Sequence, residues 1–389
     1  MKEIIKEEVY KVREKLFEIN DFIYANPELG NNEYKAVETL TTFLKENKFE
    51  VQLGIDEIET AFKASYYSGI EGPSIALLCE YDALPGIGHG CGHNMIGTMS
   101  VGAAVALSKV INKTGGKIIV FGTPAEETDG AKVKLAERGC FEGIDAAMIL
   151  HPGELTYKSG TSLAMDAIQF DFYGKTAHAA ASPEKGVNAL DAVILTFNGI
   201  NALRQHVTSD VRIHGIISDG GKAANIVPDK ATAQFYVRAA KKSYLKEVRE
   251  KVCNVARGAA LMTGAKLEIS NYEISYDDMN TNNALSEAFN SNLKLVGIED
   301  IKTPEGGHGS IDMGNVSYVA PAIHPTIGIG NPNLIGHTKD MADFTITKAA
   351  HEALLKGACA LALTGYDVIT DKELLKSIKK EFEVNTRVE

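Results

Sequence analysis

Three short apolar runs, separated by helical segments, constrain the fold of this chain most strongly. The runs cover residues 74–82, 117–127 and 145–153, and glycine, proline or acidic residues bound each of them. Apolar runs of this length are typical of strands that are buried on both faces of a parallel sheet. Helical segments such as 95–111 and 130–138 lie between the runs. The sequence therefore predicts an α/β/α domain in which a mixed, mostly parallel sheet lies between two layers of helices.

Polar side chains follow each of the three predicted strands. Asp82 ends the first run, Glu126 and Glu127 end the second, and His151 lies near the end of the third. Because ligand sites in open α/β sheets form outside the carboxyl ends of the strands, we expect these side chains to meet in one crevice. The pattern predicts a functional site before any motif is considered.

From about residue 164 the order of the elements changes. Strand, helix, strand, strand, helix and strand follow one another up to residue 278, which is a ferredoxin-like α+β arrangement. The chain has 389 residues, and one domain typically has roughly 150. We therefore predict one domain made of residues 1–163 and 279–389, with a second domain of residues 164–278 inserted into it.

Composition and charge exclude several classes of function. The formal net charge is −11, and no cluster of Lys and Arg is interleaved with aromatic residues, so nucleic acid is not an expected partner. No apolar run approaches the ~18 residues of a membrane span, and the first helix is charged and amphipathic rather than a signal sequence. The five cysteines do not resemble a disulfide framework. We expect a cytoplasmic protein with no membrane contact, in which Cys91 is a free thiol.

The segment 88–94, GHGCGHN, places Cys91 and His93 on a glycine-rich turn. Glycine permits the backbone conformations that let two donors face one point, so the two side chains are candidate metal ligands. Two other interpretations remain: a helix-capping turn with a hydrogen-bonded histidine, and a cysteine hydrolase that uses Cys91 and His93. The hydrolase is disfavoured because side chains two residues apart on a tight turn suit a nucleophile and its base poorly.

Further donors lie at the other strand ends and near the C-terminus. Glu126 and Glu127 are adjacent beyond a buried strand, so their side chains point in opposite directions and can take different roles. Taken singly, this pair, His151 and His337 would be interpreted as a solvated acidic loop, a core histidine and a surface histidine. Combined with the turn, they give enough nitrogen, oxygen and sulfur donors for two divalent ions, which predicts a metal-dependent hydrolase. The proposed ligands are Cys91, His93, Glu127, His151 and His337.

These motifs resemble those of a known family. The segments 82–94 (DALPGIGHGCGHN), 150–153 (LHPG) and 174–192 (GKTAHAAASPEKGVNALDA), with the glutamate pair, are similar to the dinuclear metal amidohydrolases and carboxypeptidases. That family includes aminoacylase-1, hippurate hydrolase and the plant auxin-conjugate hydrolases. The likeness covers nearly the whole chain and is greatest to the aminoacylase-1-like branch that hydrolyses dipeptides or acyl-amino acids. It implies a catalytic α/β domain with an inserted ferredoxin-like lid domain, through which two chains form a homodimer.

The resemblance also implies roles for individual residues. By the family pattern, the five donors would hold the metals, and Glu126 would be the general base and acid. His178 corresponds to the lid histidine that reaches the partner subunit's active site and stabilises the developing oxyanion. Three further residues are assigned to binding the substrate: Asn225, Arg238 and Ser310.

Two positions depart from the family pattern. Asn94 follows His93 where many relatives have an acid, and Glu80 stands where others have a histidine or an aspartate. We therefore expect Asp82 to orient a ligand rather than to bind metal itself.

The predicted reaction is hydrolysis of an amide bond in a small N-acyl amino acid, a dipeptide or an aryl-amide of an amino acid. A metal-activated water would attack, with Glu126 as general base and acid. The substrate would carry a free carboxylate that meets a local cation such as Arg238. Thiolate and imidazole donors favour two zinc ions per subunit, with manganese, cobalt or nickel as alternatives. A catalytically silent, metal-binding dimeric scaffold is the alternative function, and the retained Glu126 and His178 argue against it.

Overall fold

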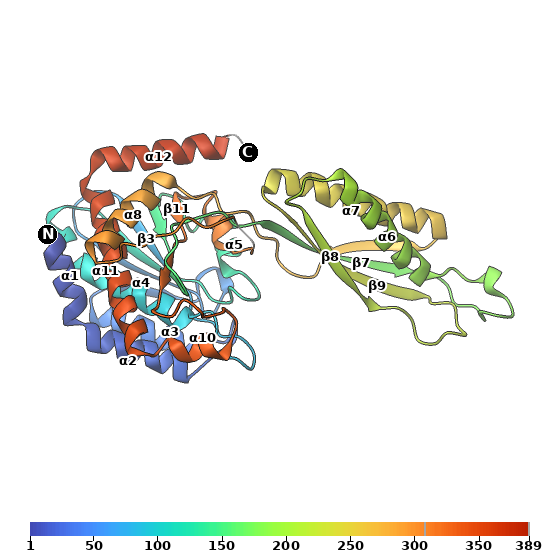
Figure 1. The fold of residues 1–389 in the computed structure, drawn as a ribbon, viewed down its shortest axis with the longest axis horizontal. Helices are drawn as coiled ribbons and strands as arrows, with labels where there is room; N and C mark the ends of the chain where they lie inside the picture. The colour runs from blue at the N-terminus through green and yellow to red at the C-terminus, as the bar shows by residue number, and fades with distance from the viewer. Residues whose placement is uncertain (307–308, 388–389) are drawn as a thin grey trace. The chain divides into compact units, whose positions relative to one another are not determined.

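The structure is a computed structural model that describes residues 1–306 and 309–387, and it divides into two compact units (Figure 1). The first unit runs from Met1 to Thr161, resumes at Met279 and continues toward the C-terminus, apart from a short segment that ends at Ser310. The second unit contains Ser162–Asp278 and that short segment. Its first residue thus lies just before residue 164, where the sequence-based boundary was drawn.

The sheet of the first unit is mixed and mostly parallel, as predicted from the apolar runs. In spatial order its strands are β1 (Glu50–Leu53), β2 (Phe62–Tyr67), β4 (Lys117–Gly122), β3 (Ser74–Cys79), β5 (Ala146–Met148) and β11 (Ala322–Ile323). Strands β4, β3, β5 and β11 are parallel neighbours, whereas β2 and β1 are antiparallel to theirs. The three apolar runs therefore form the adjacent central strands.

Helices cover both faces of this sheet. Alternate residues of β3 point to opposite sides, so that Ile75 and Leu77 join one buried cluster while Ala76 and Leu78 join another. The helices are α1 (Lys2–Lys11), α2 (Arg13–Ala25), α3 (Tyr34–Glu46), α4 (His93–Ser108), α5 (Ala131–Glu137), α8 (Asn283–Leu295), α9 (Met313–Val316), α10 (Lys339–Phe344), α11 (Lys348–Thr370) and α12 (Lys372–Arg387), with 3-10 turns η1 (Ile55–Glu57) and η2 (Ile111–Lys113).

Helices α4 and α11 contact each other in the core of the first unit. The sequence predicts no apolar run long enough to span a membrane. Two helical segments are nevertheless long and apolar enough to do so, His93–Lys113 and Lys348–Thr370. Their most apolar windows are 94% and 78% buried inside the unit. Burial of this extent is typical of a core helix. Gly357 allows α4 and α11 to approach each other closely, because a Cβ at this position would lie 2.4 Å from Met99 Sδ.

A separate two-stranded parallel pair carries one of the candidate ligands. It consists of β6 (His151–Gly153) and β12 (Thr326–Gly328), with Thr326 opposite His151. The position of His151 is therefore fixed by a segment far along the chain.

The second unit is an antiparallel sheet with two helices, in the predicted order of elements. Its strands in spatial order are β10 (Lys266–Asn271), β7 (Ala164–Tyr173), β9 (Lys230–Ala239) and β8 (Arg212–Asp219), and its helices are α6 (Ala189–Leu203), α7 (Lys242–Thr263) and the 3-10 turns η3 (Pro183–Lys185) and η4 (Arg204–His206). Helices α6 and α7 pack together and cover one face of the sheet (Figure 1).

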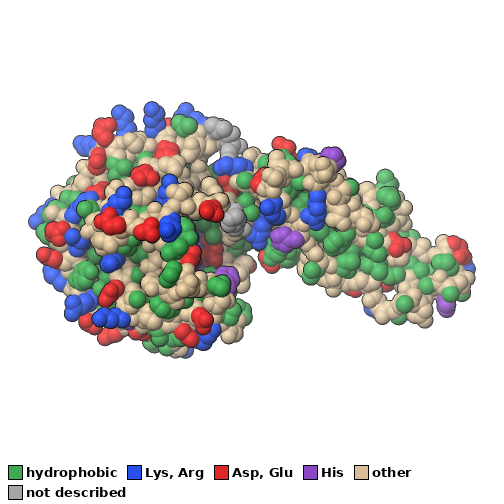
Figure 2. Space-filling view, in the orientation of Figure 1, with side chains coloured by type: hydrophobic (Ala, Val, Ile, Leu, Met, Phe, Trp, Pro, Cys, Tyr) green, Lys and Arg blue, Asp and Glu red, His purple; other side chains and the backbone are tan. Residues whose placement is uncertain are grey.

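The surfaces of the two units differ in character. Acidic and basic side chains are spread over the visible face of the first unit, whereas apolar side chains gather over the second (Figure 2). Strand β8 lies at the edge of its sheet, and its Ile216 and Ile217 are 60% and 44% exposed. An exposed apolar edge strand is a template for pairing with another chain.

Candidate metal centre

The glycine-rich turn leads directly into helix α4. Gly92 precedes the helix with φ of 77°, and a Cβ at this position would lie 2.5 Å from Pro152 Cγ. Only glycine meets both conditions without strain. His93 is the first residue of α4, and Cys91 lies just ahead of it. The turn therefore holds a thiol and an imidazole at the N-terminus of one helix.

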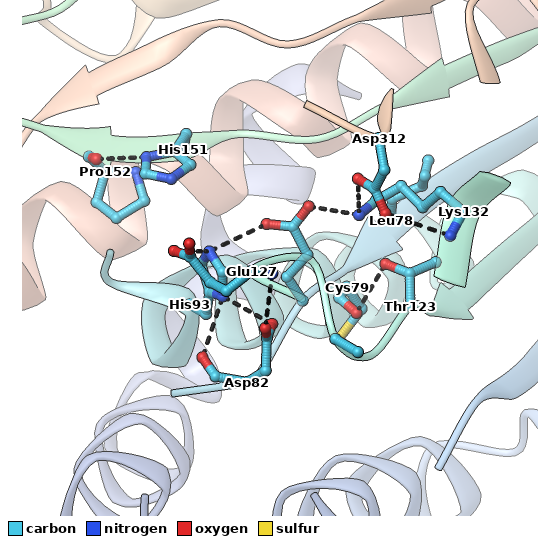
Figure 3. Close-up of polar contacts among 12 residues, drawn as sticks. Leu78, Cys79, Asp82, His93, Thr123, Glu127, Lys132, His151, Pro152 and Asp312 are labelled. Atoms are coloured by element: carbon cyan, nitrogen blue, oxygen red, sulfur yellow. Dashed lines mark hydrogen bonds and ion pairs between the residues drawn. The ribbon is translucent and has the colours of Figure 1, made fainter. Parts of the chain in front are cut away.

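His93 is oriented by Asp82. Its Nδ1 lies 2.9 Å from Asp82 Oδ1 and 3.0 Å from the Asp82 carbonyl oxygen (Figure 3). Because both partners accept, Nδ1 carries the proton and Nε2 is left to bind a metal. Although burial lowers it, the Asp82 carboxylate raises the pKa of His93 well above its ordinary value. This contact is the one expected of a residue that orients a ligand.

The second ring nitrogen of His93 faces carboxylates. Nε2 is buried and has no hydrogen-bond partner among the described residues, and it lies 3.5 Å from Glu80 Oε2 and 4.0 Å from Glu127 Oε1. The same Glu127 oxygen is also buried, and the described part of the chain gives it no hydrogen-bond donor. Two buried polar atoms without hydrogen bonds are costly, and a bound cation would satisfy both of them.

The loop after β4 supplies two carboxylates. The Glu127 amide donates to Asp82 Oδ2 at 3.0 Å, and Glu127 Oε1 lies 3.5 Å from His337 Nε2. Burial, followed by the nearby charges of Glu80 and Asp312, raises the pKa of Glu126 well above its ordinary value. A carboxyl whose proton affinity is raised is suited to accept and return a proton.

His151 presents its Nε2 to the same region. Its Nδ1 donates to the Pro152 carbonyl oxygen at 2.7 Å, which fixes the tautomer. Burial, followed by the charges of His324 and His93, lowers the pKa of His151 to about 3. The imidazole is therefore neutral, which is the form that binds metal.

His337 is held in a strained backbone conformation. Its φ is 62°, in the left-handed region, and its amide donates to the Gly90 carbonyl oxygen at 3.0 Å. The side chain is 60% exposed. Strain of this kind in a residue other than glycine is often found at functional sites. Here it ties His337 to the turn that carries Cys91.

The candidate ligand atoms form three groups, and within each group all lie within 4.8 Å of one another. Cys91, His93 and His151 form one group, and Cys91, Glu127 and His337 form another. The third joins His93 and Glu127 with Glu126. The structure thus brings together all five ligands proposed from the sequence. Cys91, His93 and Glu127 each belong to two of the groups, so the donors lie close enough together that they would hold two ions.

The chemistry of this donor set fits divalent transition metals. Thiolate and imidazole suit zinc and its neighbours, whereas magnesium and calcium prefer oxygen ligands alone. Burial raises the pKa of the Cys91 thiol to about 12. Reactive cysteines have low pKa values, so this shift argues against a cysteine nucleophile and for a thiolate formed by a bound cation.

A buried charge cluster beside the site was missed by the sequence analysis. Lys132 Nζ lies 2.6 Å from Glu80 Oε1 and 2.7 Å from Asp312 Oδ1, and all three side chains are buried. In the sequence Lys132 is an ordinary lysine of an amphipathic helix, so no signal marked it. Glu80 was noted only as a departure from the family pattern.

The remaining sequence-predicted residues lie in the second unit. His178 is exposed, and its Nδ1 accepts from the amides of Ala180 and Ala181 at 3.3 and 3.2 Å, so its Nε2 carries the proton. The Asn225 carbonyl oxygen accepts from the Ala179 amide at 3.0 Å. In the same unit, Arg238 Nη1 donates to Ser310 Oγ at 3.2 Å. The structure therefore forms two polar groupings from these residues.

Comparison with known proteins identifies relatives along the whole chain. A family model described as a peptidase dimerisation domain (M20_dimer) matches residues 164–261. The chain is 35% identical to the Xaa-Arg dipeptidase of Mus musculus, over 98% of this chain and 92% of that one. It is 28% identical to a component of the p-aminobenzoyl-glutamate hydrolase of Escherichia coli (strain K12), over 95% and 92% of the two chains.

Solved structures share the fold. A putative aminohydrolase from methicillin-resistant Staphylococcus aureus superposes with a TM-score of 0.81 at 18% identity, covering 95% of this chain and all of the other. The YXEP protein of Bacillus subtilis, described as a dinuclear metal binding peptidase from the M20 family, gives a TM-score of 0.66 at 19% identity over 90% and 98% of the two chains.

Proposed function

This chain belongs to the M20 family of metal-binding peptidases and hydrolyses an amide bond, and from this premise we propose that it is a dipeptidase. Its substrate is a dipeptide with a free carboxylate and a basic side chain. The observation that carries the proposal is the convergence of two donor groups on Cys91, with Glu126 beside them. The Xaa-Arg dipeptidases, with 35% and 34% identity, support a dipeptide as substrate.

Two metal ions are part of this proposal. One would be held by Cys91, His93 and His151, and the other by Cys91, Glu127 and His337. When bound, the ions supply Lewis-acid chemistry, which polarises a carbonyl oxygen and lowers the pKa of a water molecule. The sulfur and nitrogen donors favour zinc as the metal.

Glu126 moves the proton in the proposed reaction. Its carboxylate accepts a proton from the attacking water, whose oxygen bonds to the scissile carbonyl carbon. When the carbon–nitrogen bond breaks, Glu126 returns the proton to the leaving amine. The raised pKa of Glu126 supports both steps, because a carboxylic acid with an ordinary pKa would be a poor donor near neutral pH.

His178 and Arg238 are proposed to contribute from the second unit. His178 would donate its Nε2 proton to the oxygen that becomes negative in the transition state, in the active site of the other subunit of a homodimer. The dimerisation-domain match at 164–261 supports the homodimer. Arg238, with Ser310 and Asn225, would bind the free carboxylate. We place the dimer in the cytoplasm, because its free cysteines suit a reducing compartment.

A cavity of about 170 Å³ beside the metal ligands supports a basic side chain in the substrate. Cys91 and His151 line one side of it, and Pro152, Leu334 and Met341 supply apolar walls. Among the described residues that line it, the carboxylate is that of Glu154. The aliphatic stem of lysine or arginine would pack against the apolar walls, and the cation would pair with Glu154. Glu154→Gln should therefore raise KM for Xaa-Arg dipeptides more than for Xaa-Ala dipeptides.

The test measures amine release from a panel of dipeptides and N-acyl amino acids by zinc-loaded protein, repeated after chelation and after zinc is added back. We expect Xaa-Arg and Xaa-Lys dipeptides to be cleaved fastest, with activity lost on chelation and restored by zinc. Faster cleavage of N-acetyl amino acids would favour the second candidate, an acyl-amino acid hydrolase like the deacetylases of Bacillus subtilis at 29% and 26% identity. Zinc binding without hydrolysis of any compound would support the silent scaffold.

A further inference from the structure

The segment between helices α2 and α3, residues 26–33 (NPELGNNE), touches two of the loops that carry the site. The Glu28 carbonyl oxygen accepts from the Ala83 amide at 2.8 Å, next to Asp82. Gly30 packs closely on the loop after β4, since a Cβ there would lie 2.9 Å from Ala125 Cβ. Asn31 Nδ2 donates to Asp129 Oδ2 in that loop at 3.1 Å. The segment therefore braces both loops.

The loop after β4 turns at Ala125, which has φ of 59°. This left-handed conformation is unfavourable for a residue with a Cβ and persists only where the surroundings impose it. The Ala125 carbonyl oxygen accepts from the amides of Asp129 and Gly130 at 2.9 and 2.8 Å, which closes the turn on one side. On the other side, the Ala125 amide donates to Glu33 Oε1 at 2.9 Å.

Glu33 is an unusual choice for this contact. Its side chain is buried, and within the described structure Oε2 is buried without a hydrogen-bond partner. Burying a carboxyl group is unfavourable even when some of its hydrogen bonds are made. A buried carboxyl group thus holds an unfavourable backbone conformation at Ala125, the residue directly before Glu126.

The turn is anchored on each side of Glu126. Glu33 accepts the amide of Ala125, and Asp82 accepts the amide of Glu127 at 3.0 Å. Glu126 is the residue between these two anchored amides, so its backbone direction is set by both. If one of these hydrogen bonds is lost, the backbone at Ala125 can relax from its strained φ. We expect this relaxation to rotate the side chains of both glutamates.

We propose that Glu33 is a positioning residue for the reaction: by holding Ala125 in the left-handed conformation, it fixes where Glu126 and Glu127 point. Its role rests on the proposed function, in which Glu126 transfers the proton and Glu127 binds metal. Glu33 itself is not part of any of the three groups of candidate ligands.

The test compares two substitutions that keep the volume of the side chain. Glu33→Met has no acceptor, whereas the amide oxygen of Glu33→Gln can accept from Ala125 and its NH2 group can donate to the buried hydroxyl of Thr60, for which the described residues supply no hydrogen-bond partner. At saturating zinc we expect Glu33→Met to lower kcat by about 10²-fold with little change in KM, because a displacement of about 1 Å has this cost. Glu33→Gln should retain kcat within about threefold of the wild type.

Glu28 offers a matched control in the same segment. Its carboxylate accepts from the amides of Lys35 and Ala36, at the start of α3, and not from the turn. Glu28→Ala should lower Tm and leave kcat per zinc-loaded chain unchanged. If Glu33→Met lowered only Tm, as Glu28→Ala does, Glu33 would be a structural residue and the inference would be wrong.

Ala125→Gly tests the route through the backbone. Glycine adopts φ near 60° without strain, so the double variant Glu33→Met/Ala125→Gly should recover much of the kcat that Glu33→Met loses. A double variant as slow as Glu33→Met would overturn the inference. If Glu33→Met alone does not fold, the double variant is compared with Ala125→Gly, and a kcat about 10²-fold below that of Ala125→Gly at equal zinc content contradicts the role. Failure of the wild type to hydrolyse any substrate would count against the proposed function instead.

Discussion

Adjacent glutamates at 126 and 127 have different surroundings. Glu127 Oε1 faces His337 at 3.5 Å, whereas Glu126 carries a strongly raised pKa. We predict that Glu126→Gln keeps the metal content of the wild type and lowers kcat by at least ~10²–10⁴-fold, because proton transfer is lost. Zinc content by atomic absorption and kcat on an Xaa-Arg dipeptide check this. Loss of zinc from Glu126→Gln, with retention by Glu127→Gln, would mean that the two roles are exchanged.

His178 is expected to act on the transition state and not on the metal. Removing one donor to a developing oxyanion typically costs on the order of 10²–10³ in rate, so His178→Ala should lower kcat by this factor with zinc content unchanged. His206, an exposed histidine of the same unit, is the matched control. Equal kcat values for His178→Ala and His206→Ala would contradict the assignment.

The raised pKa of Glu33 predicts that the stability of the metal-free protein depends on pH. Burial, with a smaller effect of the Asp82 charge, raises the pKa of Glu33 to about 7. Between its unfolded pKa of about 4.5 and pH 7, the folded state keeps a proton that the unfolded state has lost, so stability decreases as pH rises. The loss is on the order of 3 kcal/mol at most. Urea unfolding from pH 4.5 to 8 should show a smaller decrease for Glu33→Gln, and identical profiles would contradict the shift.

The sequence was sufficient to identify residues whose side chains are typical metal ligands. Cys91, His93 and His151 are soft donors next to glycines or strand ends, and such positions stand out. Lys132 and Glu33 do not, because a buried lysine and a buried glutamate look like surface residues until the packing around them is known. Their partners, Asp312 and Ala125, lie far away in sequence, and no local pattern links them.

At the scale of elements, β8 offers the second unit an apolar edge for association. It lies at a sheet edge and presents Ile216 and Ile217 to solvent. If two chains pair along this edge, Ile216→Lys should shift the protein from dimer to monomer, since a lysine on an edge strand opposes pairing. Light scattering after gel filtration measures the mass. Ile70→Lys, at a 49% exposed position of the first unit, is the control. Dimers of unchanged mass in Ile216→Lys would exclude this edge from the interface.

Long apolar or amphipathic elements were predictable, and short ones were not. The central strands β3 and β4 and the order of the second unit follow from periodicity. Strands β11 and β12 contain two and three residues, which is too short for a periodic signal. Their pairing with β5 and β6 is parallel and distant in sequence, so turn chemistry gives no clue to it. For this reason the sequence could name His151 but not the strand that places it.

For the whole molecule, metal loading should affect stability as well as activity. The site gathers Glu80, Asp82, Glu126 and Glu127 around His93, and their mutual repulsion is relieved by bound cations. A ligand present at 1,000 times its Kd stabilises the folded state by about 4 kcal/mol. We therefore predict that chelation lowers Tm of the first unit by several degrees and that zinc restores it. Calorimetry with and without zinc measures the change, and an unaltered Tm would contradict a site that binds metal tightly.

The pairing of β6 with β12 also sets an order of events during synthesis. Thr326, which lies opposite His151, is made about 175 residues later, and at roughly 5–20 residues per second this delay is about 9 to 35 seconds. The second unit, Ser162–Asp278, is complete on the ribosome well before then, apart from the short segment that ends at Ser310. The second unit can therefore fold before synthesis of the first unit is complete. During that interval the edge of β5 lacks its neighbour β11, and an unpaired strand edge is open to pairing with other strands.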